Sequence, residues 1–114
     1  MSNTNFISVS ANEFEQLILQ PIMQLVDVRT TEEYINGHIA GAVNMNVTDP
    51  SGFFTEQIAD LDKTKPVAIY CRSGVRSKVA AKEMLAIGLE VYELGGGILD
   101  WLNQGKPVDD IEDE

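Results

Sequence analysis

Apolar residues in this chain alternate between short continuous runs and helically spaced patterns. Five apolar runs predict strands, at residues 6–9, 23–28, 42–45, 66–70 and 91–94. A segment with helically spaced apolar positions follows each run. Strands and helices that alternate at short spacing form a parallel sheet covered by helices, so the pattern predicts an α/β fold.

Local signals indicate where the helices begin. Ser10 with Glu13, and Thr30 with Glu33, have the capping-box spacing that precedes a helix. Further apolar positions predict a turn or helix and two more helices, around residues 54–61, 77–87 and 98–102. Ligands of parallel sheets bind beyond the carboxyl ends of the strands. Asp27 and Arg29 at the end of one predicted strand, and Cys71 at the end of another, are expected to face this crevice.

Composition and length indicate a single globular domain. The 114 residues are 44% hydrophobic and 23% charged, which is an ordinary balance for one folded unit. We predict a domain over residues 1–108 and an acidic tail over residues 109–114. No apolar run approaches the roughly 18 residues of a membrane span, and no secretory signal is visible at the start. We therefore expect a cytoplasmic protein with no membrane partner.

Charge is distributed unevenly along the chain. The net charge of −10 argues against a nucleic-acid partner, because Lys and Arg neutralise phosphates in such complexes. Between Lys63 and Lys82, however, there are six basic residues and no acidic one. This positive segment contains the only cysteine, Cys71. It is typical either of a solvated helix face or of an anion site around the thiol.

The cysteine and histidine counts limit the chemistry. One cysteine cannot close a disulfide within the chain, and one cysteine with one histidine cannot supply a typical zinc site. We expect neither a metal nor a cofactor. Any thiol chemistry must therefore belong to Cys71.

Cys71 lies at the end of the apolar run at residues 66–70 and opens a polar loop before a helix. Backbone N–H groups and a helix N-terminus favour negative charge at such a place, and nearby arginines lower the pKa of a thiol. Arg72 and Arg76 flank a turn at Gly74, whose backbone is free to curve around the sulfur. A lone cysteine is otherwise most often a small buried apolar residue. The two arginines and the glycine favour a reactive thiolate.

Three segments, in order, resemble the rhodanese family. The loop of residues 71–77, Cys-Arg-Ser-Gly-Val-Arg-Ser, resembles the rhodanese active-site loop. Residues 25–42, with Leu-Val-Asp-Val-Arg near their start and Gly-His-Ile-Ala-Gly-Ala at their end, are similar to the N-terminal signature. Residues 95–101 are similar to the C-terminal one. The resemblance implies a three-layer fold with a five-stranded, mostly parallel sheet and helices on both faces.

The resemblance also implies a reaction in two steps. Cys71 would take a sulfur from a small anionic donor such as thiosulfate, and its persulfide would pass the sulfur to a thiol or protein acceptor of unknown identity. The backbone of the loop would stabilise the terminal sulfur, and two guanidinium groups would orient the donor. The implied substrate-binding residues are Arg72, Ser73, Gly74, Val75 and Arg76.

Other polar residues have more than one interpretation. Asp27 follows an apolar run, so we expect it to have a buried partner, and the resemblance implies that it helps to hold the loop. Arg29 is expected to pair with Glu33 or another nearby acid. His38 follows a glycine that ends a helix, which favours a structural hydrogen bond over catalysis. Ser73 and Ser77 are expected to cap the next helix or to bond the loop.

Two other functions are compatible with the same residues. A rhodanese-like module could bind anions or partner proteins without turnover. Cysteine phosphatases have a related fold, but their loop has one residue more than the four between Cys71 and Arg76. The shorter loop suits one sulfur atom better than a phosphoryl group, so we expect phosphatase activity to be absent.

Overall fold

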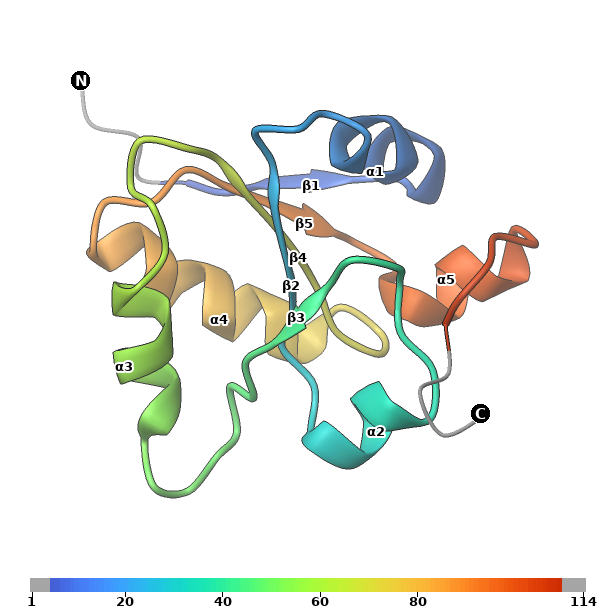
Figure 1. The fold of residues 1–114 in the computed structure, drawn as a ribbon. Helices are drawn as coiled ribbons and strands as arrows, with labels where there is room; N and C mark the ends of the chain where they lie inside the picture. Colours follow the sequence, from blue (N-terminus) through green and yellow to red (C-terminus); the bar gives the residue numbers. More distant parts are fainter. Residues whose placement is uncertain (1–4, 110–114) are drawn as a thin grey trace.

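Five parallel strands form a single sheet in this computed structural model, which describes residues 5–109. Their order across the sheet is β1-β5-β4-β2-β3 (Figure 1). The strands are β1 (Ile7–Val9), β2 (Gln24–Asp27), β3 (Val43–Asn44), β4 (Val67–Tyr70) and β5 (Val91–Leu94). Every residue of the central strand β4 is buried, because helices cover both faces of the sheet.

The helices form a layer on each side of the sheet (Figure 1). One side has α1 (Ala11–Ile18) and α5 (Gly97–Asn103), and the other has α3 (Phe53–Ala59) and α4 (Val75–Ala86). The short helix α2 (Thr31–Ile35) follows the carboxyl end of β2. The predicted α/β architecture, with a five-stranded sheet between helices, is confirmed.

Two apolar clusters fill the spaces between these layers. In the cluster beneath α1 and α5, the ring of Phe14 meets those of Tyr70 and Trp101 edge-on, each with centroids 6.3 Å apart. In the other cluster, Ile58 of α3 and Met84 of α4 pack against β4. Because β4 contributes alternate side chains to both clusters, the strand that precedes Cys71 is held from both faces.

Local signals predicted two helix starts correctly and a third one wrongly. Both capping boxes form, at Ser10 with Glu13 and at Thr30 with Glu33. Helix α4, however, begins at Val75, two residues before the predicted start. The reason is Gly74, which takes the left-handed conformation (φ 101°) as the N-cap and turns the chain directly into the helix.

The described part of the chain ends against the loop that follows α2. The N–H of His38 donates to Asp109 O at 2.8 Å, and the N–H of Asp109 donates to His38 O at 2.7 Å. Apart from Asp109, the acidic tail predicted for residues 109–114 lies outside the described residues. Among residues 5–109, no helix combines the length and apolar character needed to cross a bilayer.

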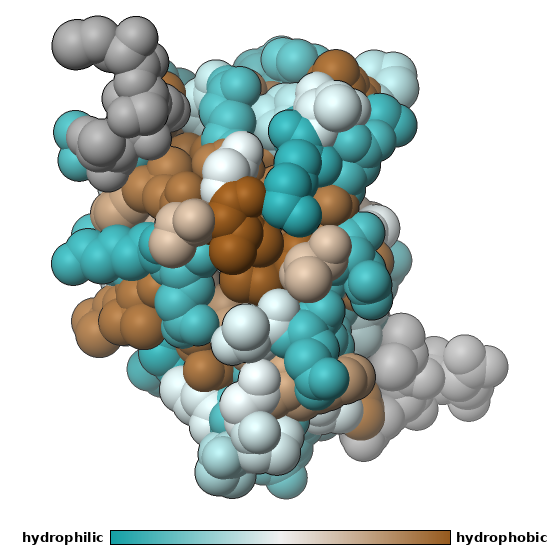
Figure 2. Space-filling view, turned by 90° about the vertical axis from the view of Figure 1, so that its left-hand side faces the viewer, coloured by the Kyte–Doolittle hydropathy of each residue, from teal (hydrophilic) through white to brown (hydrophobic). Residues whose placement is uncertain are grey.

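The surface mixes apolar and polar side chains. On the face seen in Figure 2, hydrophobic residues gather near the centre and hydrophilic residues border them. Several large apolar side chains are exposed, including Val79 and Leu102. Isolated apolar residues are ordinary on a protein surface, so only those beside functional groups bear on function.

Candidate active site

Cys71 directly follows β4, at the carboxyl edge of the sheet. The neighbouring strand β2 ends in register with it, since Asp27 pairs with Tyr70. Residues 71–74 then form a tight turn before α4. The loop is therefore shorter than the sequence predicted, because Val75 and Arg76, which were expected to lie in the loop, already belong to the first turn of α4.

The sulfur of Cys71 lies inside this turn and is surrounded by donors. The residue is 1% exposed. The N–H of Gly74 donates to Sγ at 3.0 Å, and the Ser77 hydroxyl oxygen lies 3.5 Å from the sulfur. Burial opposes ionisation of the thiol, but hydrogen bonds from Ser77 and from the N–H groups of Gly74 and Ser73 outweigh it and lower the pKa of Cys71. The site favours a thiolate.

The second glycine segment packs directly against the cysteine loop. A Cβ atom on Gly74 would lie 2.2 Å from Gly95 O, and one on Gly97 would lie 2.2 Å from Arg72 O. Both glycines also have positive φ values, of 101° and 67°. Side chains at either position would push the two segments apart. The glycine triplet, which the sequence linked to the loop only by resemblance, is thus needed for the turn to close.

The start of α5 binds the carbonyl groups of the same loop. The N–H of Ile98 donates to Cys71 O at 2.9 Å, and the N–H of Leu99 donates to Arg72 O at 3.1 Å. The loop carbonyls therefore point away from the sulfur and toward α5. This arrangement leaves N–H groups, rather than carbonyl oxygens, on the side that faces Sγ.

The two arginines of the loop have different partners. Arg76 forms a forked pair with Glu33, with Nη1 to Oε1 at 2.7 Å and Nη2 to Oε2 at 2.9 Å. This pair lowers the pKa of Glu33 to about 2, against the opposing effect of burial. Arg72 is exposed, and its guanidinium has no hydrogen-bond partner among the described residues. The sequence treated these arginines as equivalent, but only Arg72 is free to meet an incoming anion.

Asp27 and Arg29 form a buried pair at the end of β2. Arg29 Nη2 donates to Asp27 Oδ2 at 2.6 Å, and the N–H of Arg29 donates to Asp27 Oδ1 at 2.9 Å. The expected buried partner of Asp27 is thus present. Arg29 therefore pairs with a nearby acid, as expected, but this acid is Asp27 and not Glu33. Glu33 instead faces Arg76 from the first turn of α2. Among the described residues, Asp27 makes no direct hydrogen bond to residues 72–76.

The structural role predicted for His38 agrees with the structure, whereas the helix caps predicted for Ser73 and Ser77 do not form. His38 Nδ1 lies 2.9 Å from Tyr34 O, and the two rings stack at 3.9 Å, which fits the structural role expected for the histidine. The helix caps predicted for Ser73 and Ser77 are wrong, because Gly74 is the N-cap and no side chain caps α4. Ser77 does bond the loop, through Gly74 O at 3.3 Å.

Glu93 is a buried polar residue at the site that the sequence analysis missed. It is 0% exposed on β5 and accepts hydrogen bonds from the hydroxyl groups of Ser8 and Ser77. Lys78 Nζ lies 2.9 Å from Glu93 Oε1. The sequence could have indicated it, because Glu93 is an acidic residue within the apolar run 91–94. Asp27 was identified by the same kind of pattern. Ser77 therefore connects Cys71 to a buried carboxylate.

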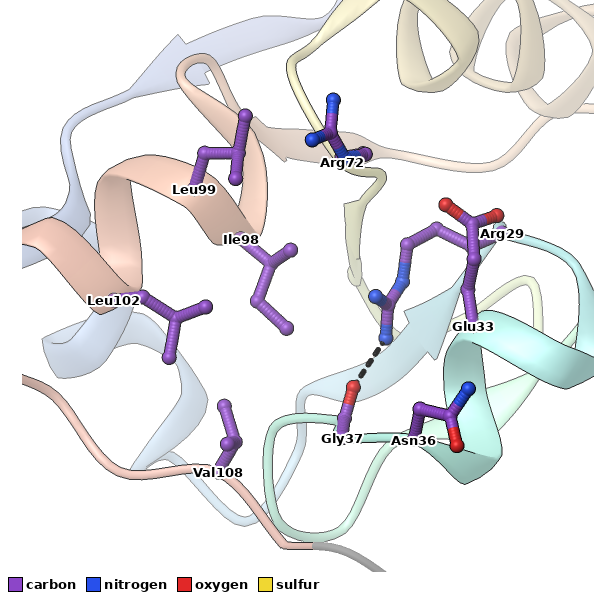
Figure 3. A pocket seen from close by; sticks show the side chains of 9 residues that line it. All are labelled: Arg29, Glu33, Asn36, Gly37, Arg72, Ile98, Leu99, Leu102 and Val108. Carbon is purple, nitrogen blue, oxygen red and sulfur yellow. Dashed lines mark hydrogen bonds between the residues drawn. The ribbon is translucent and has the colours of Figure 1, made fainter.

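A groove of about 280 Å³ opens beside the loop (Figure 3). One wall comes from α5 and the segment after it, and the other from α2 and the loop that follows it. Its lining residues are Arg29, Glu33, Asn36, Gly37, Arg72, Ile98, Leu99, Leu102 and Val108. The crevice expected beyond the strand ends is therefore present. Among residues 5–109, no three His, Cys, Asp or Glu side chains come together as a metal site.

The loop, the glycine segment and the strand order agree with a known family. A family model of the rhodanese-like domain matches residues 10–104. The chain belongs to this family.

Relatives of this rhodanese-like domain include enzymes and larger proteins. Thiosulfate sulfurtransferase GlpE of Shewanella oneidensis is 33% identical over 99 residues, which cover 86% of this chain and 94% of that protein. The tRNA uridine(34) hydroxylase of Nitrobacter winogradskyi is 36% identical over 101 residues, but only 40% of its length is covered. A crystal structure of a rhodanese-related protein from Thermoplasma volcanium has a TM-score of 0.80 at 29% identity, covering 91% of this chain and 98% of that one.

Proposed function

We propose that this rhodanese-like domain is a cytoplasmic sulfurtransferase that moves a sulfane sulfur from thiosulfate or a similar donor to a thiol through a Cys71 persulfide. The main support is the sulfur itself, since Cys71 Sγ accepts the Gly74 N–H at 3.0 Å and its pKa is lowered. GlpE, which matches this chain over nearly its whole length, is named a thiosulfate sulfurtransferase. Cytoplasmic thiols are kept reduced, as this chemistry requires.

The first step is an attack by the Cys71 thiolate on the outer sulfur of thiosulfate. A bond forms between the two sulfurs, the sulfur–sulfur bond of thiosulfate breaks, and sulfite leaves with the electron pair. The product is Cys71–S–S⁻, and the total charge is unchanged. Arg72 attracts the dianionic donor, because its guanidinium is exposed and has no partner within residues 5–109. N–H groups of the loop stabilise the negative charge on the terminal sulfur.

The second step returns Cys71 to its thiolate form. An acceptor thiolate attacks the terminal sulfur, a new persulfide forms on the acceptor, and the Cys71 thiolate leaves. Cyanide would discharge the same persulfide in vitro, yielding thiocyanate. A cysteine whose thiolate is stabilised by hydrogen bonds is a good leaving group, so the features that favour loading also favour discharge.

Intact mass measures the first step directly. After incubation with thiosulfate, we expect the wild-type protein to gain the mass of one sulfur and Cys71→Ser to gain none. Cyanide should then remove the added mass and release one thiocyanate per protein. A wild-type protein that gains no mass would overturn the proposal.

An interaction module without turnover is the second candidate. Its support is that the tRNA uridine(34) hydroxylase relative has this domain within a much longer chain. Steady release of thiocyanate from thiosulfate and cyanide would exclude a module without turnover. Hydrolysis of an aryl phosphate would instead favour a phosphatase, which the short loop makes us expect to be absent. That nucleic acid is not a partner stays a prediction from the net charge.

A further inference from the structure

Glu93 is a buried carboxylate within the apolar strand β5. Its side chain is 0% exposed and meets residues of both β1 and α4. The Ser8 hydroxyl donates to its Oε1 atom, the Ser77 hydroxyl donates to Oε2, and Lys78 Nζ lies 2.9 Å from Oε1. Removing a carboxylate from water costs free energy that pairing restores only in part, so a buried charge does little for stability alone. Its place beside the cysteine loop points to a role in the chemistry there.

The Ser77 hydroxyl lies between Glu93 and the sulfur of Cys71. Ser77 Oγ is 3.5 Å from Sγ, and the same hydroxyl donates to Glu93 Oε2. A serine hydroxyl has a single proton to donate. When Cys71 is a thiolate, the sulfur and the carboxylate therefore compete for one proton, and their negative charges repel each other across one hydroxyl group. Glu93 makes the thiolate less stable than the donors of the loop alone would make it.

Sulfur loading moves the negative charge away from Glu93. In the resting protein the charge is on Sγ, whereas in Cys71–S–S⁻ it is on the added sulfur, one bond farther out. Ser77 and Glu93 are both 0% exposed, so the donor reaches Sγ from the side that they do not occupy. Once Sγ is no longer charged, the Ser77 proton stays with Glu93 without competition. The carboxylate therefore disfavours the thiolate more strongly than it disfavours the persulfide.

Lys78 balances part of the charge of Glu93 from the solvent side. Its side chain is 46% exposed, and its Nζ atom donates to Gly74 O at 3.0 Å as well as to Glu93 Oε1. The oxygen that accepts from Ser77 is the other one, Oε2, so both interactions are present together. Water screens a half-exposed cation, which therefore balances a fully buried carboxylate incompletely. Some negative charge thus remains uncompensated on the side of Ser77.

The remaining charged residues near the loop form ion pairs of their own or are exposed to solvent. They are Arg76, which pairs with Glu33, Arg29, which pairs with Asp27, and the exposed Arg72. Within residues 5–109, Glu93 is the one acidic side chain that hydrogen bonds join to the sulfur. An effect of buried negative charge on Cys71 is therefore assigned to Glu93.

We propose that Glu93 is a positioning residue that acts through Ser77 to disfavour the Cys71 thiolate and thereby shifts the loading equilibrium toward the persulfide. This inference rests on the proposed sulfur transfer. In the loading step the thiolate takes the outer sulfur of thiosulfate and sulfite leaves with the electron pair, and in the reverse step sulfite removes that sulfur. Glu93 favours the forward direction, and Lys78 limits how strongly it does so.

The loading equilibrium can be measured directly. Each protein is mixed with thiosulfate and sulfite at fixed ratios, without an acceptor, at pH 8, and intact mass gives the loaded fraction. We expect Glu93→Gln to lower the equilibrium constant about threefold to tenfold, because Ser77 can then donate to the thiolate, and a hydrogen bond to a charged group has at least this effect. Lys78→Met should raise the constant about twofold to fivefold, because Glu93 loses its cation.

Opposite signs separate an effect of charge from a loss of structure. Both variants break the same ion pair, so a loosened loop would shift both equilibria in one direction. Lys82→Met is the matched control, because Lys82 is also exposed on α4, one turn after Lys78, and has no acidic partner among the described residues. Its equilibrium should not change. An unchanged equilibrium in Glu93→Gln, or shifts of the same sign in the two variants, would overturn the proposal. If Glu93→Gln does not fold, the half-exposed position of Lys78 still provides the test.

Alkylation separates this inference from the proposed function. Iodoacetamide reacts with the thiolate and needs no sulfur donor, so its rate against pH reports the ionisation of Cys71 in every variant. We expect the midpoint of this curve to move to lower pH in Glu93→Gln and to higher pH in Lys78→Met. Curves that coincide with that of the wild type would overturn the role of Glu93 even if thiosulfate loads the protein. If the curves move as expected but thiosulfate adds no sulfur, it is the proposed function that fails.

Discussion

The two sides of the Cys71 loop are built differently. On the buried side, Ser77 and Glu93 bond to each other, and Glu93 also bonds to the exposed side chains of Ser8 and Lys78. On the exposed side, Arg72 has no partner among the described residues and borders an open groove. The buried side therefore fixes the sulfur and its ionisation, while the exposed side is available for recognition. Variants on the two sides should change different measurements.

Gly74→Ala should have the largest effect, because it acts on the contact that closes the loop. A Cβ atom there would meet Gly95 O at 2.2 Å, so either the loop or the glycine segment must move. We expect a loss of about 2–4 kcal/mol in the free energy of unfolding and at least a tenfold slower persulfide formation. Urea denaturation and intact mass measure the two effects.

Gly88→Ala is the control for backbone strain alone. Its φ of 92° is similar to that of Gly74, but nothing lies within 4 Å of the added Cβ. We expect a loss of about 1–2 kcal/mol and unchanged sulfur loading. Equal losses for both variants would mean that contact with Gly95 is not what requires glycine at position 74.

Arg76→Gln and Arg72→Gln should separate stability from recognition. Arg76→Gln leaves the carboxylate of Glu33 without its forked partner, and we expect it to cost about 1–3 kcal/mol in unfolding experiments. Arg72→Gln should change stability by less than about 0.5 kcal/mol but raise the KM for thiosulfate and weaken its dependence on salt. The reverse pattern would show that Arg76, and not Arg72, meets the donor.

Ser77→Ala and Glu93→Gln should shift the ionisation of Cys71 in opposite directions. Removal of the Ser77 hydroxyl deletes a hydrogen bond that favours the thiolate, so the pKa of Cys71 should rise. Glu93→Gln removes a buried negative charge that Ser77 connects to the sulfur, so repulsion of the thiolate decreases and the pKa should fall. Thiolate absorbance in a pH titration measures both. Shifts of the same sign would contradict a link through Ser77.

Glu33→Gln should have an effect that depends on pH, lowering stability most above pH 4.5 and least in acid. The pKa of Glu33 is lowered from 4.5 to about 2, so its pairing with Arg76 stabilises the fold fully above pH 4.5. This contribution disappears as the pH falls toward 2. Glutamine keeps the capping spacing but cannot titrate, so the variant should lose less stability over that range than the wild type. Parallel curves of unfolding free energy against pH would argue against the pair.

Local patterns predicted much of the site, but they did not predict its partners. Cys71 at a strand end and the capping pairs were found because they depend on residues within a few positions of one another. The start of α4 was misplaced because apolar spacing does not show where the chain turns into a helix, and the left-handed conformation of Gly74 makes that turn two residues earlier. Glu93 was overlooked because a strand pattern does not show which buried residue its carboxylate will face.

The sequence by itself determined the α/β order, the position of the single cysteine and the short turn before a helix. Only the tertiary structure decided that Glu33 pairs with Arg76, 43 residues away, and that Ser77 bonds to Glu93 on a different strand. It also decided that the glycine segment closes the loop and that α5 forms one wall of the groove. Short-range hydrogen bonds follow from spacing along the chain. Long-range pairs follow from strand order and helix packing, which bring distant residues to one edge of the sheet.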